Sequence, residues 1–387
     1  MDILEFLMAT WLSAFVLFLL INFGYILLVF ILAKVKGKPV QKASSFTPFL
    51  SILIPCYNVD SVIDRKIKNT LSIDYPSDKF EIIAVESGST DCSHTKLSKY
   101  ADQKAIRLVR QTKRSGKSSA INRGLKECKG DIVVLTDADA RVRRDAIREL
   151  AKNFADQEIG AVVGNLTITP GESLLSKMNH SFYKFFRQTP RIWESAIDSA
   201  SFWSGELCAF RKSLLGRIEE DIVNDDRYIL LKIRSKGYRA ICDPKSRVYE
   251  HDAEDAQGQV IHRRRTTAGT IQGTLRFKHL LFNRKYGWFG MLVFPSHLLR
   301  VVLLPMLLLV VQILAPVAVL NLWSPNGPMW LAAGVMTLFL ACLFEAGRKL
   351  LSSLFYSIIV QIAVLAGLID YITKKHTVLW IRVPKRW

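Results

Sequence analysis

The chain opens with a long stretch that carries no charge. Phe6 to Ala33 is uncharged, and a helix of that length crosses the roughly 30 Å hydrocarbon core of a membrane. A signal peptide is the alternative, but it would begin with basic residues and have a shorter apolar run. Here Asp2 and Glu5 precede a run that is too long. Residues 1–40 are therefore predicted to form a transmembrane anchor.

The C-terminal part of the chain is also apolar. Val301 to Phe344 has no charged residue and is interrupted by turn-forming residues at 321–328, and a second uncharged stretch runs from Leu350 to Ile369. Transmembrane helices are predicted near 301–320, 329–345 and 350–370, within a membrane region at 301–371. The middle helix is short for a complete crossing. A basic tail follows at 372–387.

The positions of the lysines predict the orientation in the membrane. Lysines follow the first apolar stretch directly: Lys34, Lys36, Lys38 and Lys42. Basic residues stay on the cytoplasmic side, so the large middle region is predicted to be cytoplasmic in a multi-pass cell-membrane protein. The basic tail would lie outside after a third C-terminal pass, so the number of passes is left open.

The net charge of +19 is compatible with two kinds of partner. Nucleic acid is one, but the chain has no nucleic-acid-binding motif. A basic surface attracted to anionic lipid headgroups explains the charge of a membrane protein more simply. The six cysteines include no C-x-x-C pair, which argues against a zinc or redox site. The oligomeric state is left open.

The middle region, 45–275, alternates predicted strands with predicted helices. Apolar runs at 49–58, 79–91, 104–111 and 130–140 are typical of strands, and 62–71 and 118–128 are typical of helices. This alternation predicts an α/β fold with a mostly parallel sheet flanked by helices. Ligands bind at the carboxyl ends of such strands, where Tyr57, Glu86 and Asp137 are expected.

Two short motifs carry candidate chemistry. The carboxylates of Asp137 and Asp139 follow a buried strand, and two such close charges favour a cation between them. Mg²⁺ or Mn²⁺ bridging to a diphosphate fits, whereas an acidic turn capping the next helix is the structural alternative. The segment 114–122, RSGKSSAIN, lacks the first glycine of a P-loop because Gln111 takes its position.

Together, SILIPCYN, VESGSTD, RSGKSSAINRG and LTDADA resemble family 2 glycosyltransferases in order and spacing. The resemblance covers 49–272 and is strongest to the membrane-integrated branch that includes hyaluronan, chitin and poly-N-acetylglucosamine synthases. It implies a glycosyltransferase-A fold for 45–275 and an inverting transfer from a nucleotide-diphosphate sugar, with UDP as the expected carrier. It also implies a divalent ion, Mn²⁺ or Mg²⁺, held by Asp137 and Asp139.

The resemblance also implies roles for other residues. A first set would bind the nucleotide: Pro55, Tyr57, Asn58, Glu86, Asp91, Lys117 and Asp137. Glu86-Ser87 replaces the usual acidic pair of the family, and a solvated lysine at a helix start is the alternative for Lys117. Asp226 matches the general base, with Asp225 as the alternative. Gly205 and Glu206 fall where the family forms its acceptor pocket.

One motif departs from the family. Processive synthases have Q-x-x-R-W, but here His262 and Thr266 replace the glutamine and the tryptophan. The run Arg263, Arg264 and Arg265 could still clamp the diphosphate, whereas a basic helix face lying on lipid is the alternative. Thr266 offers little stacking surface for a growing glycan. A single transfer to a lipid or lipid-linked glycan is therefore favoured.

Residues 276–300 mix aromatic, aliphatic and basic side chains. They are predicted to form an interfacial amphipathic helix that would bring such an acceptor to the site. A processive polysaccharide synthase, a polyprenyl phosphate sugar synthase and a non-catalytic membrane scaffold are the alternative functions.

Overall fold

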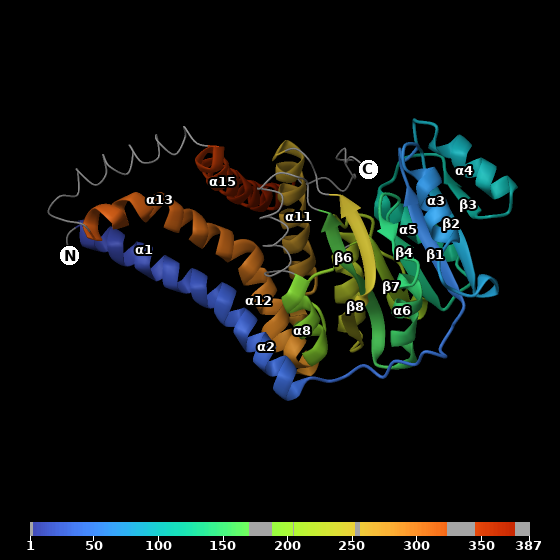
Figure 1. The fold of residues 1–387 in the computed structure, drawn as a ribbon, viewed down its shortest axis with the longest axis horizontal. Coiled ribbons are helices and arrows are strands. Elements are labelled where there is room, and N and C mark those ends of the chain that lie inside the picture. Colours follow the sequence, from blue (N-terminus) through green and yellow to red (C-terminus); the bar gives the residue numbers. More distant parts are fainter. Residues whose placement is uncertain (1–2, 170–187, 204, 252–255, 323–344, 376–387) are drawn as a thin grey trace.

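The computed structural model describes residues 3–169, 188–203, 205–251, 256–322 and 345–375. An α/β domain lies at one end of the molecule, and long helices extend away from it (Figure 1). The two parts correspond to the predicted catalytic region and to the predicted apolar segments.

The described residues of the α/β domain build one sheet of eight strands in the order β3-β2-β1-β4-β7-β6-β8-β5. In chain order these strands are β1 Leu50–Cys56, β2 Phe80–Ser87, β3 Arg107–Gln111, β4 Ile132–Thr136, β5 Arg141–Val142, β6 Ile159–Thr169, β7 Leu207–Arg211 and β8 Arg239–His251. The first four coincide with the predicted strands.

The sheet is mixed, and the half formed by β1 to β4 is parallel. β1, β2, β3 and β4 run parallel, and β6 pairs with β8 in the same way. β7 is antiparallel to both of its neighbours, β4 and β6, and pairs Leu207 with Thr136. The start of β7 therefore lies beside the end of β4. This arrangement brings Gly205 and Glu206 next to Asp137.

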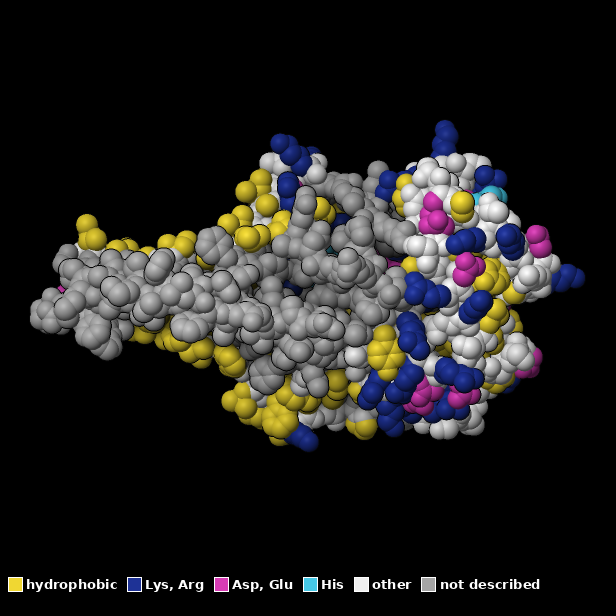
Figure 2. Space-filling view, turned by 45° about the horizontal axis from the view of Figure 1, so that its top comes forward, with side chains coloured by type: hydrophobic (Ala, Val, Ile, Leu, Met, Phe, Trp, Pro, Cys, Tyr) yellow, Lys and Arg dark blue, Asp and Glu magenta, His cyan; other side chains and the backbone are white. Residues whose placement is uncertain are grey.

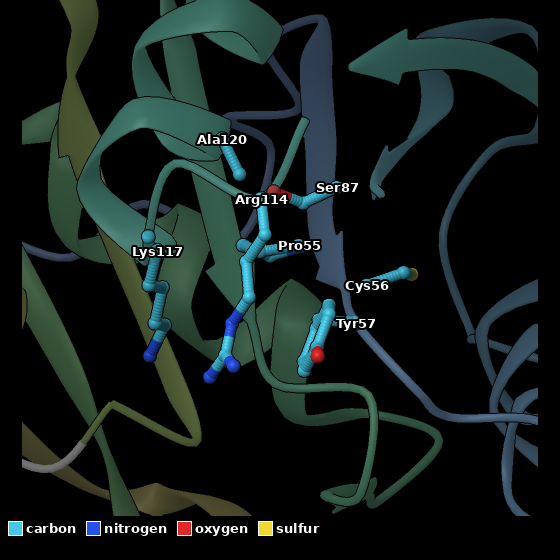
Figure 3. Close-up of a pocket in the computed structure, with 8 residues that line it drawn as sticks. Pro55, Cys56, Tyr57, Ser87, Arg114, Lys117 and Ala120 are labelled. Atoms are coloured by element: carbon cyan, nitrogen blue, oxygen red, sulfur yellow. The ribbon is translucent and has the colours of Figure 1, made fainter. Parts of the chain in front are cut away.

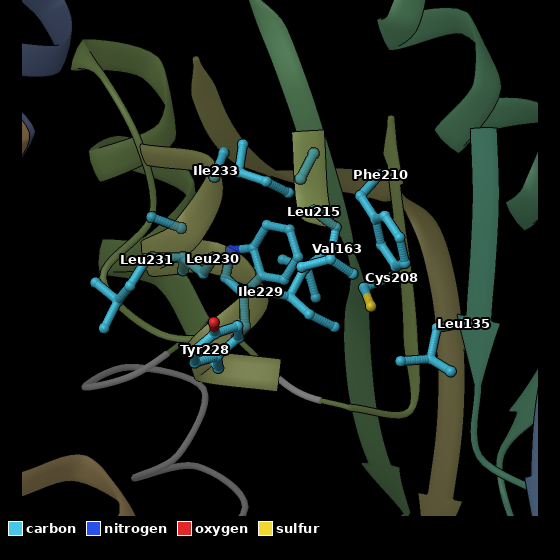
Figure 4. Packing of buried hydrophobic residues seen from close by; sticks show 14 of the residues in the cluster. Leu135, Val163, Cys208, Phe210, Leu215, Tyr228, Ile229, Leu230, Leu231 and Ile233 are labelled. Atoms are coloured by element: carbon cyan, nitrogen blue, oxygen red, sulfur yellow. The ribbon is translucent and has the colours of Figure 1, made fainter. Parts of the chain in front are cut away.

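Helices cover both faces of the sheet. They are α3 Ile63–Leu71, α4 Ser93–Asp102, α5 Lys117–Glu127, α6 Ala146–Lys152, α8 Thr189–Ile197, α9 Lys212–Leu215 and α10 Asp225–Ser235. Figure 4 shows α10 packed on β6 and β7 through Tyr228, Ile229 and Leu230, all buried. Burying each large apolar side chain contributes about 1.5–3 kcal/mol, so this packing holds the N-terminus of α10 firmly against the sheet.

Two apolar helical segments extend from the domain. The first joins α1 Ile3–Leu19 to α2 Tyr25–Lys36 through a π-helical turn, and the second runs from Phe289 through α12 Phe294–Leu298 into α13 Leu304–Leu322. Glu5–Lys36 and Phe289–Pro316 are long and apolar enough to cross a membrane. α1 packs along α13, and apolar side chains are exposed on these helices, seen in yellow along the edges of the extended part in Figure 2. The first segment coincides with the predicted anchor.

The residues of the predicted interfacial amphipathic helix, 276–300, do not form one continuous helix. Two short 3₁₀ turns, Lys278–Leu280 and Arg284–Tyr286, occupy its first half, and the apolar helix already begins at Phe289. Gly287, with a φ of 56°, reverses the chain between them. The Asp198 carboxylate then accepts a hydrogen bond from the Phe289 N–H at 3.0 Å and caps the new helix.

The remaining described helices are α11 Ala256–Arg276 and α15 Glu345–Ile372, which pack against each other. A Cβ on Gly367 would lie 2.4 Å from the Arg264 carbonyl oxygen, so glycine permits this close crossing. The predicted helix at 350–370 lies within α15. The predicted helix at 329–345 and most of the predicted basic tail fall outside the described residues.

Candidate active site

A pocket opens at the carboxyl ends of β1 and β2. Its lining consists of Pro55, Cys56, Tyr57, Ser87, Arg114, Gly116, Lys117 and Ala120. Three of the predicted nucleotide-binding residues, Pro55, Tyr57 and Lys117, are thus brought together. In Figure 3, Arg114 and Lys117 extend side by side in the same direction, while Cys56 points away from them.

The start of α5 gives Lys117 its position. Gly116 precedes the helix with a φ of 85°, a conformation that favours glycine, and the chain turns there into α5. Just before this turn, the Arg114 guanidinium lies 4.2 Å from the centre of the Tyr57 ring. This cation–π contact makes a flat surface at the pocket. Arg114 belongs to the motif noted in the sequence, but the sequence singled out only its lysine.

The other predicted nucleotide residues hold the neighbouring loops. The Asn58 side chain accepts from Thr90 N–H at 2.8 Å, and the Glu86 carboxylate accepts from Ser89 N–H at 2.5 Å. Asp91 accepts from the backbone N–H groups of Ser93 and Asp60. Burial would raise the pKa of Asp91, but these hydrogen bonds outweigh it and lower that pKa. The described contacts of these three side chains shape the pocket rim.

An acidic cluster surrounds Lys117 beside the pocket. The Lys117 ammonium lies 2.8 Å from Asp137 Oδ1 and 3.3 Å from Asp225 Oδ2. All three side chains are largely buried, with exposed fractions of 11%, 15% and 6%. Asp137 ends β4, whereas Asp225 begins α10, so Lys117 links the two elements. Predicted nucleotide, metal and base residues thus meet at one point.

Gly205 closes this cluster from the side of β7. A Cβ at this position would lie 3.3 Å from Lys117 Nζ, 3.5 Å from Asp137 Oδ2 and 3.9 Å from Asp226 Cβ. The carbonyl of Glu206 accepts a hydrogen bond from Thr136 Oγ1 at 2.7 Å. The predicted acceptor residues therefore lie between the carboxylates of β4 and those of α10.

The buried carboxylates repel one another, which changes how they titrate. Burial, together with the charge of Asp225, raises the pKa of Asp226 to about 7, although Lys117 opposes the rise. Burial likewise raises the pKa of Asp137 to about 6, against the effect of Lys117. Burial would lower the pKa of Lys117, but Asp137 and Asp225 raise it well above its usual value. The ammonium therefore stays charged while Asp226 exchanges a proton near neutral pH.

Lys66 is a second buried cation, and the sequence reading missed it. Its ammonium donates to Thr136 Oγ1 at 2.7 Å and to the Ala140 carbonyl at 2.8 Å, which fixes both ends of the Asp137–Asp139 turn. Burial lowers the pKa of Lys66 to about 8. Its spacing from Ile63, Ile67 and Thr70 places Lys66 on the buried face of α3, and that pattern is visible in the sequence.

The three arginines of α11 have different surroundings. Arg264 forms a two-pronged ion pair with Asp370 of α15. Arg265 donates to the Val223 carbonyl at 3.2 Å, and Asn224 donates to the Thr266 carbonyl, so this part of α11 braces the segment before Asp225. Arg263 is half-buried on the same helix.

The sequence around this site matches a known protein family. Residues 51–218 match the family described as "Glycosyl transferase family 2". The matched range includes the pocket, Lys117, the Asp137–Asp139 turn and Gly205. The chain carries a family 2 glycosyltransferase domain. This confirms the predicted family and enzyme class for that domain.

Curated relatives are poly-beta-1,6-N-acetyl-D-glucosamine synthases. The protein of Staphylococcus aureus strain COL is 29% identical over 199 residues, which are 50% of this chain and 48% of the relative. That of Staphylococcus epidermidis is 26% identical over 201 residues, 51% of this chain and 48% of the relative. The chain thus matches about half the length of these relatives.

A solved structure resembles nearly the whole chain. It is the mannosyltransferase PcManGT from Pyrobaculum calidifontis in complex with GDP-Man and Mn²⁺. Identity is 26% with a TM-score of 0.72, and the match covers 96% of this chain and 100% of that one. The sheet order and this likeness confirm the predicted glycosyltransferase-A fold.

Proposed function

We propose that the protein is a membrane-bound, inverting glycosyltransferase that moves a sugar from a nucleotide-diphosphate sugar to a lipid or lipid-linked acceptor. The observation that carries the proposal is the cluster of Lys117, Asp137, Asp225, Asp226 and Gly205 beside a pocket at the sheet edge. Apolar helices long enough to cross a membrane adjoin the same domain. The catalytic domain would face the cytoplasm, as the lysines after the anchor suggest.

Asp226 is proposed as the general base. A hydroxyl of the acceptor is a weak nucleophile until a neighbouring group takes its proton. A carboxylate whose pKa is raised to about 7 is suited to this task near neutral pH. Its position next to Gly205, where a side chain would intrude, leaves room for an acceptor to approach. The acceptor oxygen would then attack the anomeric carbon as the nucleoside diphosphate leaves.

The donor side is proposed to use the pocket and its cations. The Arg114–Tyr57 surface would stack against the base of the nucleotide, and Lys117 would contact the diphosphate. Arg263 and Arg265 of α11 are proposed to clamp the diphosphate with their positive charge. UDP was the carrier expected from the sequence, but the solved neighbour holds GDP-Man, so both carriers need testing.

The residues fit a divalent-ion site whose coordination the diphosphate of the donor would complete. No group of three or more His, Cys, Asp or Glu side chains among the described residues could hold a metal unaided. However, Asp137 is a largely buried carboxylate beside Asp139, and its Oδ1 has the Lys117 ammonium at 2.8 Å as an ion-pair partner. Mg²⁺ and Mn²⁺ sites commonly use one or two carboxylates plus phosphate oxygens. Asp137 and Asp139 would hold the ion, which would neutralise the leaving diphosphate.

A processive polysaccharide synthase is the second candidate, because the curated relatives are synthases of a polymer. Thr266 in place of the tryptophan of the family argues against it. Product length distinguishes the two: a single transfer yields one lipid species, and processive synthesis yields a ladder or a smear on a gel.

The test of donor use is direct. Full-length protein in native lipids is incubated with radiolabelled UDP and GDP sugars, and the released nucleoside diphosphate is measured with EDTA, Mn²⁺ or Mg²⁺. We expect turnover of one carrier class, its loss in EDTA and its recovery with either metal. Full turnover in EDTA would contradict the metal assignment. Absence of turnover with every donor would favour the scaffold alternative.

A further inference from the structure

A buried polar cluster lies where the apolar helices meet the α/β domain. It contains Tyr25 of α2, Glu194 of α8 and Arg300 of the second apolar segment. Tyr25 donates to Glu194 Oε1 at 2.6 Å, and Arg300 donates to the same oxygen at 3.0 Å. The Arg300 guanidinium also lies 4.1 Å from the centre of the Tyr25 ring. Three segments far apart in sequence thus meet on one carboxylate.

This cluster is costly to bury. The exposed side-chain fractions are 12% for Arg300 and 0% for Glu194, and Arg300 is the only Lys, Arg, Asp or Glu within the largely apolar segment Phe289–Pro316. A buried ion pair gives little net stability compared with apolar side chains, and ionisable groups in membrane segments commonly serve function. General packing of the helices therefore does not account for it.

The second carboxylate oxygen of Glu194 points to the loop that leads into the active site. Glu194 Oε2 accepts a hydrogen bond from the Ser201 N–H at 2.7 Å, and Arg300 lies 3.4 Å from Ser201 Oγ. Ser201 is buried and precedes Gly205, which contacts the acidic cluster. Glu194 and Arg300 therefore hold the chain at Ser201, shortly before Gly205, which faces Lys117 and Asp226.

The beginning of the same loop is held in a similar way. Asp198 lies 3.3 Å from Arg234 of α10, and its other carboxylate oxygen caps the apolar helix at Phe289. The Arg239 side chain donates to the Asp198 carbonyl at 2.9 Å. The loop Asp198–Trp203 is thus held at two points. Asp198 contacts Arg234 of α10 and the helix that begins at Phe289. Ser201 contacts Glu194 of α8 and Arg300 of the second apolar segment.

We infer that Glu194, Arg300 and Tyr25 are positioning residues that hold the loop Asp198–Trp203, and through it Gly205 and Glu206, in place for the acceptor. The inference rests on the proposed function, which gives Gly205 and Glu206 to the acceptor. The junction between the apolar helices and the α/β domain would therefore help to position the acceptor. Donor binding, which uses Tyr57, Arg114 and Lys117, is independent of it.

The test compares Arg300→Met, Arg300→Lys and Tyr25→Phe in the full-length protein in lipid. Tyr75→Phe is the matched control, because Tyr75 donates to the Pro48 carbonyl at the same 2.6 Å as Tyr25 does to Glu194. The first readout is hydrogen–deuterium exchange of peptides covering 198–203. The second is the fraction of labelled sugar that reaches the lipid phase rather than being released as free sugar, together with the KM for the donor.

We expect Arg300→Met to speed exchange in 198–203 by about tenfold or more, because the Ser201 amide loses its held partner. The transferred fraction should fall about fivefold or more, with the donor KM changed by less than about twofold. Arg300→Lys should restore most of both, Tyr25→Phe should show a smaller change in the same direction, and Tyr75→Phe should show none.

Unchanged exchange in both Tyr25→Phe and Arg300→Met would overturn the inference, as would a donor KM that rises as much as transfer falls. If Arg300→Met does not fold, Tyr25→Phe and Arg300→Lys decide the question. Exchange is measured without substrate. If the wild-type protein turns over no donor, the proposed function is contradicted. The exchange rates would still test whether Glu194, Arg300 and Tyr25 hold the loop.

Discussion

At the scale of the residue, Lys117 controls the charge of the acidic cluster. Its ammonium lies against Asp137 and Asp225 and lowers the pKa of both Asp137 and Asp226 against the effect of burial. A buried, uncompensated carboxylate is costly, so the cluster depends on this cation. Lys117 also lines the pocket proposed for the nucleotide, which would link donor binding to the charge of the proposed base.

The first residue-scale prediction concerns pH. Asp226 can accept a proton only when it is deprotonated, and its pKa is raised to about 7. The kcat for transfer should therefore be low in acid, rise as the pH passes through about 7 and then level off. Because these carboxylates interact, the rise belongs to the coupled group as a whole. The measurement is kcat against pH at saturating donor.

Lys117→Met sharpens this prediction. Losing the cation should move the rise in kcat to higher pH, since Lys117 lowers the pKa of Asp226. The donor KM should increase about tenfold or more, because losing a charged hydrogen-bond partner costs about 1.5–3 kcal/mol. Lys126→Met, an exposed position on the same helix, is the control and should change neither. A rise that stays at the same pH in Lys117→Met would contradict the assignment of Asp226.

How far single residues could be read from the sequence depended on local pattern. Pro55, Tyr57 and Lys117 were predicted to bind the nucleotide from the resemblance of their motifs to the family, and all three line one pocket. Lys66 was missed, although its helical spacing was visible, because a lysine on a buried face is an unusual observation. The tie of Asn58 to Thr90 depends on a loop contact that no spacing reveals.

At the scale of the element, α11 connects the catalytic domain to the C-terminal helix. Its glycines allow close contact: a Cβ at Gly269 would lie 2.5 Å from the Asn224 side chain, directly before α10. On its other side, Arg264 pairs with Asp370 where Gly367 permits α15 to cross. The three arginines therefore need not share one role. The diphosphate clamp is proposed for Arg263 and Arg265, and a tether to α15 for Arg264.

The element-scale prediction separates these roles. Arg264→Ala and Asp370→Asn break the same ion pair from opposite sides, so they should loosen α15 equally, measured as equal decreases in melting temperature. Both should leave the donor KM within about twofold of wild type, since neither side chain lines the pocket. Arg265→Ala serves as the comparison and should reduce turnover. A donor KM that rises in Arg264→Ala but not in Asp370→Asn would contradict the tether and indicate that Arg264 contacts the diphosphate.

Elements differed in how well the sequence predicted them. β1 and β4 are buried along their whole length, which is typical of a parallel sheet, and they lie where expected. The antiparallel β7 depends on long-range pairing with β4 and could not be read from its own residues. The residues of the predicted interfacial helix are divided, because Gly287 and the Asp198 cap end one segment and begin another.

At the scale of the whole molecule, the acidic site joins parts of the chain that are distant in sequence. Asp137 comes from β4, Gly205 from the segment before β7, and Asp226 from α10. The apolar helices adjoin the same domain, which suits an acceptor that arrives from a membrane (Figures 1 and 2). The family motifs predicted the members of this site, but only the fold brings them together.

The central claim is that this site transfers a sugar with Asp226 as base, and one measurement tests it most directly. Label from a radiolabelled donor is counted in the lipid phase for wild type, Asp226→Asn and the neighbouring Asp225→Asn, with donor affinity measured in parallel. Asp226→Asn should transfer about 10²–10⁴-fold less while binding donor normally, since a general base contributes that much. Wild-type transfer by Asp226→Asn would contradict the claim. If Asp225→Asn also transferred normally, an already ionised phosphate would be the acceptor.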